Sequence, residues 1–104
     1  MMRVVLKSKH NTHFATAEYD GSKLTVLPGS RINLVLSYDA MPDTVKEKRS
    51  NRELVSSEGV VLKEIAFNSP SAAAQFVTGR SVNGYVSWRI DDKISLKEYR
   101  SQNG

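Results

Sequence analysis

Residues 67–88 read Phe67-Asn-Ser-Pro-Ser-Ala-Ala-Ala-Gln-Phe-Val-Thr-Gly-Arg-Ser-Val-Asn-Gly-Tyr-Val-Ser-Trp88 and contain the clearest structural signals of the chain. Ser69 is a good helix cap because its hydroxyl accepts from a free backbone N–H, and Pro70 suits the first helical turn. Ala72–Thr78 is therefore predicted to be helical, and Gly79 to end the helix. Its apolar face consists of Ala73, Phe76 and Val77. The small alanines would let this helix pack close to a sheet.

After this helix, the sequence predicts a turn, a strand and a last helix. Asn83-Gly84 is a tight-turn signal because both residues tolerate positive φ. Tyr85–Ile90 then reads as a strand. Ser95-Leu-Lys-Glu98 has the spacing of a capping box, which opens a short helix to about Arg100. We expect Ser101–Gly104 to be frayed.

The N-terminal part reads as strands joined by turns. Met2–Ser8 is rich in β-branched residues. Phe14–Tyr19 and Lys23–Leu27 flank an Asp20-Gly21 pair, which is a strong hairpin signal. Pro28-Gly29 ends this run as a turn. These residues predict the first strands of an antiparallel sheet.

The middle of the chain predicts one more strand and one helix. Arg31–Tyr38 is a candidate strand, and Val60–Phe67 is a strand or an extended connection. In the Arg31–Tyr38 strand, one face would consist of Ile32, Leu34 and Leu36. A helix is predicted from about Thr44 to Ser57, with Thr44 and Glu47 as a capping box and Gly59 as its stop. The pattern as a whole predicts an α+β fold, a small antiparallel sheet of N-terminal hairpin strands plus later strands, with two or three short helices.

The composition indicates one ordinary globular domain over residues 1–104, with no room for a second core. Cysteine is absent, which excludes disulfides and thiolate metal sites. The apolar runs are too short to span a bilayer and no signal-peptide core is present, so we expect a soluble cytoplasmic protein. Fifteen Lys and Arg against 11 Asp and Glu give a net charge of +4, which mildly favours a polyanionic partner.

The signals in residues 67–89 occur together in one known family. The segments are Phe67-Asn-Ser-Pro-Ser-Ala-Ala-Ala74, Val77-Thr-Gly-Arg-Ser-Val-Asn-Gly-Tyr85 and Trp88-Arg89. In this order they resemble the domain of unknown function 4357. Upstream, Ala17–Ser30 looks like the family's strand with a glycine-serine turn, and Arg52–Gly59 like its charged helix. The resemblance extends over about residues 14–100.

The resemblance implies a function by association. The family is typically found at the C-terminal end of GIY-YIG nucleases and in restriction-modification-like proteins of bacteria, as a non-catalytic module. It therefore implies a DNA-binding or DNA-targeting accessory domain, without the nuclease activity of its neighbours. Tyr85 stands where the family usually has tryptophan, and Arg89 where it usually has lysine. The turn at Asp91-Asp92-Lys93 lacks the family's common glycine.

Ten polar and basic residues are candidates for contacts with nucleic acid. Four lie on the predicted charged helix, which can follow a phosphate backbone. Two serines at a helix start can hold a phosphate, and the residues around the predicted turn offer an aromatic ring and two arginines. They are Lys46, Lys48, Arg49, Arg52, Ser69, Ser71, Arg80, Asn83, Tyr85 and Arg89. A solvated helix face, a helix cap and a turn explain the same residues structurally, and Trp88 is expected in the core.

No catalytic, metal or cofactor site is predicted. His10 and His13 are three residues apart but lack further nitrogen or sulfur ligands at a suitable spacing. Pro28-Gly29-Ser30-Arg31 lacks the spacing of a phosphate-binding loop. We therefore expect a protein that is not an enzyme and has no cofactor.

Two functions remain open at this point. The first is a DNA-associated accessory domain, with nucleic acid as partner. The second is a protein-interaction module that docks onto a partner enzyme, which a contiguous apolar patch including Tyr85 would favour over a positive stripe. An enzyme would need a deep pocket with convergent titratable groups. The oligomeric state is not predicted.

Overall fold

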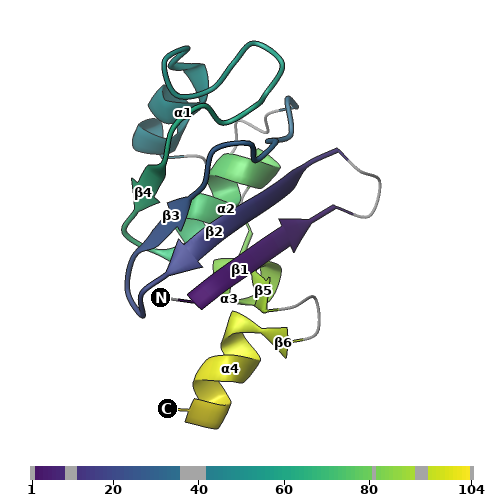
Figure 1. Cartoon of the computed structure of the whole chain (residues 1–104), viewed down its shortest axis with the longest axis vertical. Coiled ribbons are helices and arrows are strands. Elements are labelled where there is room, and N and C mark those ends of the chain that lie inside the picture. The colour runs from purple at the N-terminus through teal and green to yellow at the C-terminus, as the bar shows by residue number, and fades with distance from the viewer. Residues whose placement is uncertain (1, 9–11, 36–41, 81, 91–93, 104) are drawn as a thin grey trace.

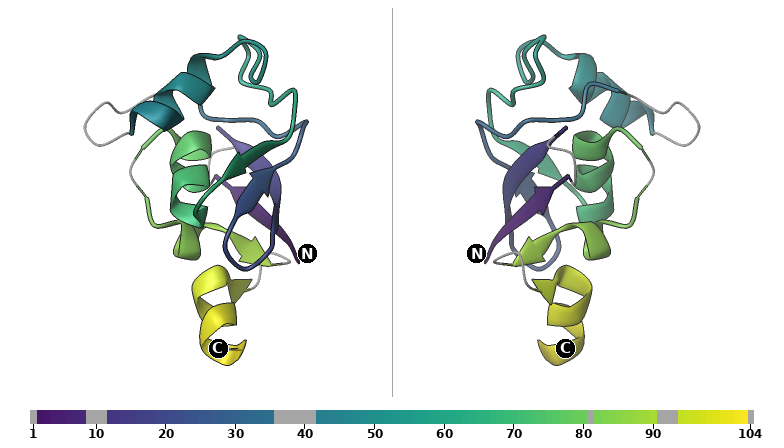
Figure 2. Two further views of the ribbon diagram at one scale, coloured as in Figure 1. Left: turned by 90° about the vertical axis from the view of Figure 1, so that its left-hand side faces the viewer. Right: turned by 90° about the vertical axis from the view of Figure 1, so that its right-hand side faces the viewer.

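The protein is one antiparallel sheet with helices packed on one of its faces (Figures 1 and 2). The structure is a computed structural model and describes residues 2–8, 12–35, 42–80, 82–90 and 94–103. The strands are β1 (Met2–Lys7), β2 (Phe14–Tyr19), β3 (Leu24–Val26), β4 (Ile65–Phe67), β5 (Arg89–Ile90) and β6 (Ile94–Ser95). Their order in the sheet is β4-β3-β2-β1-β5-β6, and every pair is antiparallel.

Four helices accompany the sheet in the described part of the chain: α1 (Asp43–Ser50), α2 (Pro70–Thr78), α3 (Gly84–Ser87) and α4 (Leu96–Asn103). The predicted fold class, α+β with a small antiparallel sheet, is therefore confirmed. None of the helices in the described ranges is long and apolar enough to cross a membrane.

The core lies between α2 and the sheet. Alternation along the strands turns one set of side chains toward the helix. This set consists of Val4, Leu6, Ala15, Ala17, Tyr19, Leu24, Val26, Ile65 and Phe67, all buried. The rings of Phe67 and Phe76, on β4 and α2, lie 5.1 Å apart between centroids. No helix of the described ranges covers the other face of the sheet, which faces the viewer in Figure 1.

The prediction for α2 is confirmed at both ends. The Ser69 hydroxyl accepts from the backbone N–H of Ala72 at 3.2 Å, and Pro70 is the first helical residue. Gly79 ends the helix in the left-handed conformation, with φ of 79°. That conformation favours glycine because it has no Cβ.

The predicted turn at Asn83-Gly84 and the strand from Tyr85 are wrong. Asn83 instead caps α3, because its side chain accepts from the backbone N–H of Tyr85 at 2.9 Å. The strand begins only at Arg89. Gly84 is required for close packing, because a Cβ at this position would overlap the Pro70 carbonyl and the Ser71 nitrogen of α2.

Trp88 fixes the same contact from the other end of α3. Its indole N–H donates to the Pro70 carbonyl at 3.0 Å, and the side chain is fully buried. The expectation that this tryptophan packs in the core is confirmed. The start of α2 and the whole of α3 thus form one rigid junction.

The helix predicted over residues 44–57 is too long. It ends at Asn51, whose backbone N–H donates to the Lys48 carbonyl. The capping box is also wrong, because Pro42 is the cap residue and no side chain caps the helix. The chain turns after Asn51 because Val55 then reaches the core, where it forms a bridge with Val61. Gly59 lies in the following turn and not at a helix end.

The strand predicted over residues 31–38 does not form in its described part. Arg31 bridges Phe14 and Val60, and Ile32 is buried as expected. Leu34, predicted on the same face, is 64% exposed, and residues 36–38 lie outside the described ranges. The backbone N–H of Asn33 donates to the Val77 carbonyl of α2, so the segment leaves the sheet.

The capping box of the last helix is confirmed. The Ser95 hydroxyl accepts from the backbone N–H of Glu98 at 3.2 Å. The helix runs to Asn103, beyond the predicted end near Arg100 and into the segment expected to fray. Leu96 anchors it in the core, and the rest projects from the body of the domain (Figures 1 and 2).

A substitution at Gly84 tests the junction. We expect Gly84→Ala to lower the free energy of unfolding by about 2 kcal/mol or more, as overpacking does. Gly21→Ala is the control, since φ there is 103° but no heavy atom lies within 4 Å of the added Cβ. It should cost about 1 kcal/mol. Urea denaturation measures both, and an equal loss for the two variants would contradict the steric role of Gly84.

Candidate nucleic-acid interface

The predicted basic helix is α1, which packs on the helix side of the molecule, away from the open sheet face (Figure 2). Arg49 is half-buried, and its guanidinium donates to the backbone carbonyls of Phe76 and Asn33. Burial lowers the pKa of Arg49. The Lys48 ammonium lies 5.7 Å from the centroid of the Phe67 ring. Two of the four predicted cations of this segment thus stabilise the fold, while Lys46 and Arg52 are half-buried and exposed, respectively.

The predicted polar residues of the 69–85 region mostly hold the α2–α3 junction together. Ser69 and Asn83 cap the two helices. The Ser71 hydroxyl accepts from the backbone N–H of Gly84 at 3.0 Å. Tyr85 is half-buried and packs against the core. Each of these residues therefore makes a contact that stabilises the fold locally.

Arg80 and Arg89 line one pocket, although they are nine positions apart in the sequence. The pocket, about 590 Å³ in volume, is lined by Leu6, Lys7, Ser8, Thr12, His13, Thr78, Arg80, Val82, Val86, Ser87 and Arg89. It contains no acidic residue among the described ones. We call it the β1-edge pocket.

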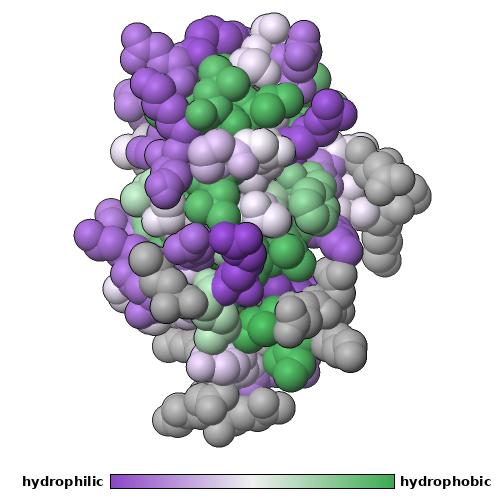
Figure 3. All heavy atoms as spheres, viewed as in Figure 1, coloured by the Kyte–Doolittle hydropathy of each residue, from purple (hydrophilic) through white to green (hydrophobic). Residues whose placement is uncertain are grey.

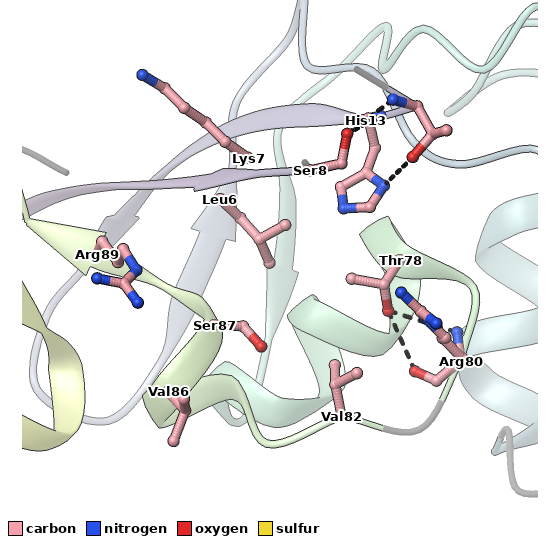
Figure 4. Close-up of a pocket in the computed structure, with 11 residues that line it drawn as sticks. Leu6, Lys7, Ser8, His13, Thr78, Arg80, Val82, Val86, Ser87 and Arg89 are labelled. Atoms are coloured by element: carbon pink, nitrogen blue, oxygen red, sulfur yellow. Dashed lines mark hydrogen bonds between the residues drawn. The ribbon is translucent and has the colours of Figure 1, made fainter. Parts of the chain in front are cut away.

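The β1-edge pocket exists because β1 and β5 pair only briefly. Among the described residues, Val5 and Arg89 are the one register pair between these strands. Beyond Val5 the edge of β1 is open, and α3 and the end of α2 form the opposite wall. Figure 4 shows Leu6 and Val82 pointing toward each other across the pocket, with Arg80 at one end and Arg89 at the other. Lys7 leaves β1 on the opposite side from Leu6.

His13 closes the end of the pocket near Arg80. Its side chain is 6% exposed, and Nδ1 lies 3.0 Å from the Thr12 hydroxyl. Burial, and secondarily the charge of Arg80, lower the pKa of His13 below its usual value of 6.5. The ring is therefore neutral at pH 7 and contributes hydrogen bonding without positive charge. No group of three or more metal-ligating side chains occurs in the described ranges.

The open side of the sheet carries a second set of cations, of which only Arg89 was predicted from the sequence. Strand and bridge pairing places them together: Arg3 opposite Glu18, Lys7 opposite Phe14, Phe14 opposite Arg31, and Val5 opposite Arg89. We call this surface the basic sheet face and define it by Arg3, Lys7, Arg31, Arg89, Phe14 and Glu18. The four cations and the Phe14 ring are exposed, and Glu18 is half-buried. Figure 3 views this side and shows hydrophilic and apolar groups next to one another on it.

Two side-chain pairs within the basic sheet face are resolved in detail. Arg3 and Glu18 form an ion pair at 3.4 Å. The Lys7 ammonium lies 5.8 Å from the centroid of the Phe14 ring, which is itself 45% exposed. Among the strand and bridge residues of this face in the described part, Glu18 is the one acid. In the sequence, this face is indicated by the alternate positions of Arg3, Val5 and Lys7 along β1, which place these three side chains on one side of the sheet.

These features define a small antiparallel α+β domain with helices on one side and a basic, partly aromatic surface on the other. The chain belongs to the family described as Domain of unknown function (DUF4357), whose model matches residues 5–100. The resemblance predicted from residues 14–100 is thus confirmed and extends further toward the N-terminus. No curated protein and no solved structure matches the chain.

Arg49 and Arg52 provide a test of the structural role of α1. We expect Arg49→Gln to lower the free energy of unfolding by roughly 2 kcal/mol, because two main-chain carbonyls lose a charged donor. Arg52 is exposed, so Arg52→Gln should change it by less than about 0.5 kcal/mol. Thermal and urea unfolding measure the difference. Equal stability of the two variants would show that the Arg49 contacts contribute nothing.

Proposed function

We propose that this protein is a non-catalytic DNA-binding domain that contacts DNA through the basic sheet face. The observation that carries the proposal is the charge of that face, where register gathers four cations against one acidic side chain. Phosphate contacts by Lys and Arg release counterions from DNA and supply most sequence-independent affinity. The net charge of +4 acts in the same direction.

The spacing of the cations suits a phosphate backbone. Arg3 and Lys7 are four residues apart on β1, which corresponds to about 13 Å along the strand. Arg31 and Arg89 extend the face across the sheet on either side of β1 and β2. Such a surface offers several phosphate contacts at once and needs no deep groove.

The single acid of the face does not cancel this charge. The Arg3–Glu18 pair is partly exposed, with side-chain exposures of 66% and 32%. Exposed ion pairs contribute at most about 1 kcal/mol, so Arg3 can exchange Glu18 for a phosphate at little cost. Phe14 adds a ring on which a base can stack where the strands of DNA are separated.

The resemblance described from the sequence suggests a biological setting for this proposal. As an accessory module beside GIY-YIG nucleases or restriction-modification-like enzymes, such a domain would hold a nuclease on its DNA. We therefore propose DNA targeting, and not DNA cleavage, for this chain.

A protein-interaction module is the second candidate, and one observation favours it. Leu34 and Val35 are adjacent and 64% and 75% exposed, which is unusual for neighbouring apolar residues. Tyr85, which such a patch was expected to include, is half-buried in α3. Among the described residues this patch is defined by two side chains, whereas the basic sheet face has five exposed ones. DNA binding is therefore the better-supported function.

A pair of double variants tests the proposal. Lys7→Gln with Arg31→Gln removes two charges from the basic sheet face, and Lys46→Gln with Arg52→Gln removes two from the α1 region. We expect only the first pair to reduce the slope of log K against log salt for duplex DNA, by about 2, because each lost phosphate contact removes about 0.9. Fluorescence anisotropy at several salt concentrations measures the slopes. The proposal would be refuted if the α1 pair reduced the slope more than the sheet-face pair did, or if the unmodified protein did not bind duplex DNA at low salt.

A further inference from the structure

The β1-edge pocket combines an apolar middle with charged ends. Leu6 and Val82 face each other across it, and the two arginines lie at its opposite ends (Figure 4). Its volume of about 590 Å³ is within the usual range for small-molecule sites, which extends from about 300 to 1,000 Å³. The shape and size therefore suit a ligand larger than a simple ion.

The hydroxyl groups of the pocket are already engaged within the protein. The Thr78 hydroxyl donates to the Ala74 carbonyl at 2.8 Å, and that of Ser87 to the Asn83 carbonyl at 2.9 Å. The Ser8 hydroxyl accepts from the backbone N–H groups of Thr12 and His13. The cationic donors among the lining residues are the Lys7 ammonium and, at the two ends, the guanidinium groups of Arg80 and Arg89.

Those guanidinium groups have the properties of anion receptors. Neither the Arg80 nor the Arg89 side chain donates a hydrogen bond within the described part of the chain, and both residues are exposed. No acid of the described residues lines the pocket to neutralise them. Guanidinium binds phosphate in a bidentate manner, so each end is suited to one phosphate.

We propose that the β1-edge pocket binds one unpaired nucleotide, with the base against the apolar lining at Val82 and the flanking phosphates on Arg80 and Arg89. A nucleotide within a strand has a phosphate on each side of its base, which corresponds to two cationic ends around an apolar middle. This inference rests on the proposed function and specifies it further: the domain recognises single-stranded or extruded nucleotides in addition to duplex backbone.

The pocket is continuous with the basic sheet face. Arg89 lies opposite Val5 in the sheet register and also lines the pocket, so it belongs to both surfaces. A DNA backbone held on the sheet face would thus pass the pocket mouth at Arg89. An unpaired nucleotide at that point could enter without the rest of the strand leaving the sheet.

The test uses Arg80→Gln, since Arg80 is exposed, lines the pocket and is not part of the basic sheet face. Lys97→Gln on α4 is the matched control with the same change in charge. The probes are an eight-residue oligothymidylate, the same strand with one central abasic residue, a blunt 12-base-pair duplex, free thymidine 5′-monophosphate and inorganic phosphate. Anisotropy follows the oligonucleotides, and NMR of the His13 ring follows the small probes.

The proposal predicts a selective loss. Arg80→Gln should weaken the oligothymidylate and the free nucleotide roughly tenfold, because a charge-assisted contact is lost, and the duplex less than twofold. The unmodified protein should bind the intact strand more tightly than the abasic strand. It should also bind the nucleotide more tightly than inorganic phosphate.

Three results would overturn the proposal: equal effects of Arg80→Gln and Lys97→Gln on the single strand, equal affinity for the intact and abasic strands, or equal affinity for phosphate and nucleotide. The free nucleotide does not require the basic sheet face. A protein that binds the nucleotide through Arg80 but does not bind duplex would therefore refute the proposed function and leave the pocket assignment standing. Duplex binding by the unmodified protein, together with no effect of Arg80→Gln on the oligothymidylate or the free nucleotide, would refute the pocket assignment and leave the proposed function standing.

Discussion

The placement of α3 and β5 depends on the contact between α3 and the first turn of α2. The Trp88 indole donates to the Pro70 carbonyl, and Gly84 lies so close to Pro70 that a side chain has no room. A buried indole N–H without an acceptor would be costly, so the hydrogen bond fixes the direction of the ring. Because Arg89 follows Trp88 directly, the same contact sets where β5 joins the sheet.

This junction explains why the domain has both of its proposed binding surfaces. All described helices that pack on the sheet lie on one side, which leaves the other side as the basic sheet face (Figure 2). Among the described residues β5 pairs with β1 at Val5, and the β1-edge pocket lies beyond that point, between β1 and α3. Residues that specify the family and the fold thus position the functional residues without contacting a ligand themselves.

Local sequence signals predicted the fold well where one residue type has one physical consequence. The Ser69-Pro70 start, the Gly79 stop and the Ser95 cap are set by their own neighbours, and all three are confirmed. Asn83-Gly84 was misread because the same pair suits a turn, a helix cap or a close approach, and only the distant Pro70 decides between them. The helix end at Asn51 likewise depends on Val55 reaching the core.

The candidate site was predicted only in part, for a related reason. Arg80 and Arg89 were found because they are close in sequence to a strong motif. The cations of the basic sheet face come from three separate segments, and strand register alone brings them together. The clustered cations of α1 gave the stronger sequence signal, yet Arg49 lies against main-chain carbonyls.

The most direct test of the account is to map the DNA-binding surface by NMR. A ¹⁵N-labelled sample would be titrated with a short duplex at low salt, and shift changes of backbone and arginine side-chain N–H groups recorded. The account predicts that the largest changes fall on Arg3, Lys7, Arg31 and Arg89, with small changes along α1 and α4. Changes centred on α1, or on Leu34 and Val35, would contradict it.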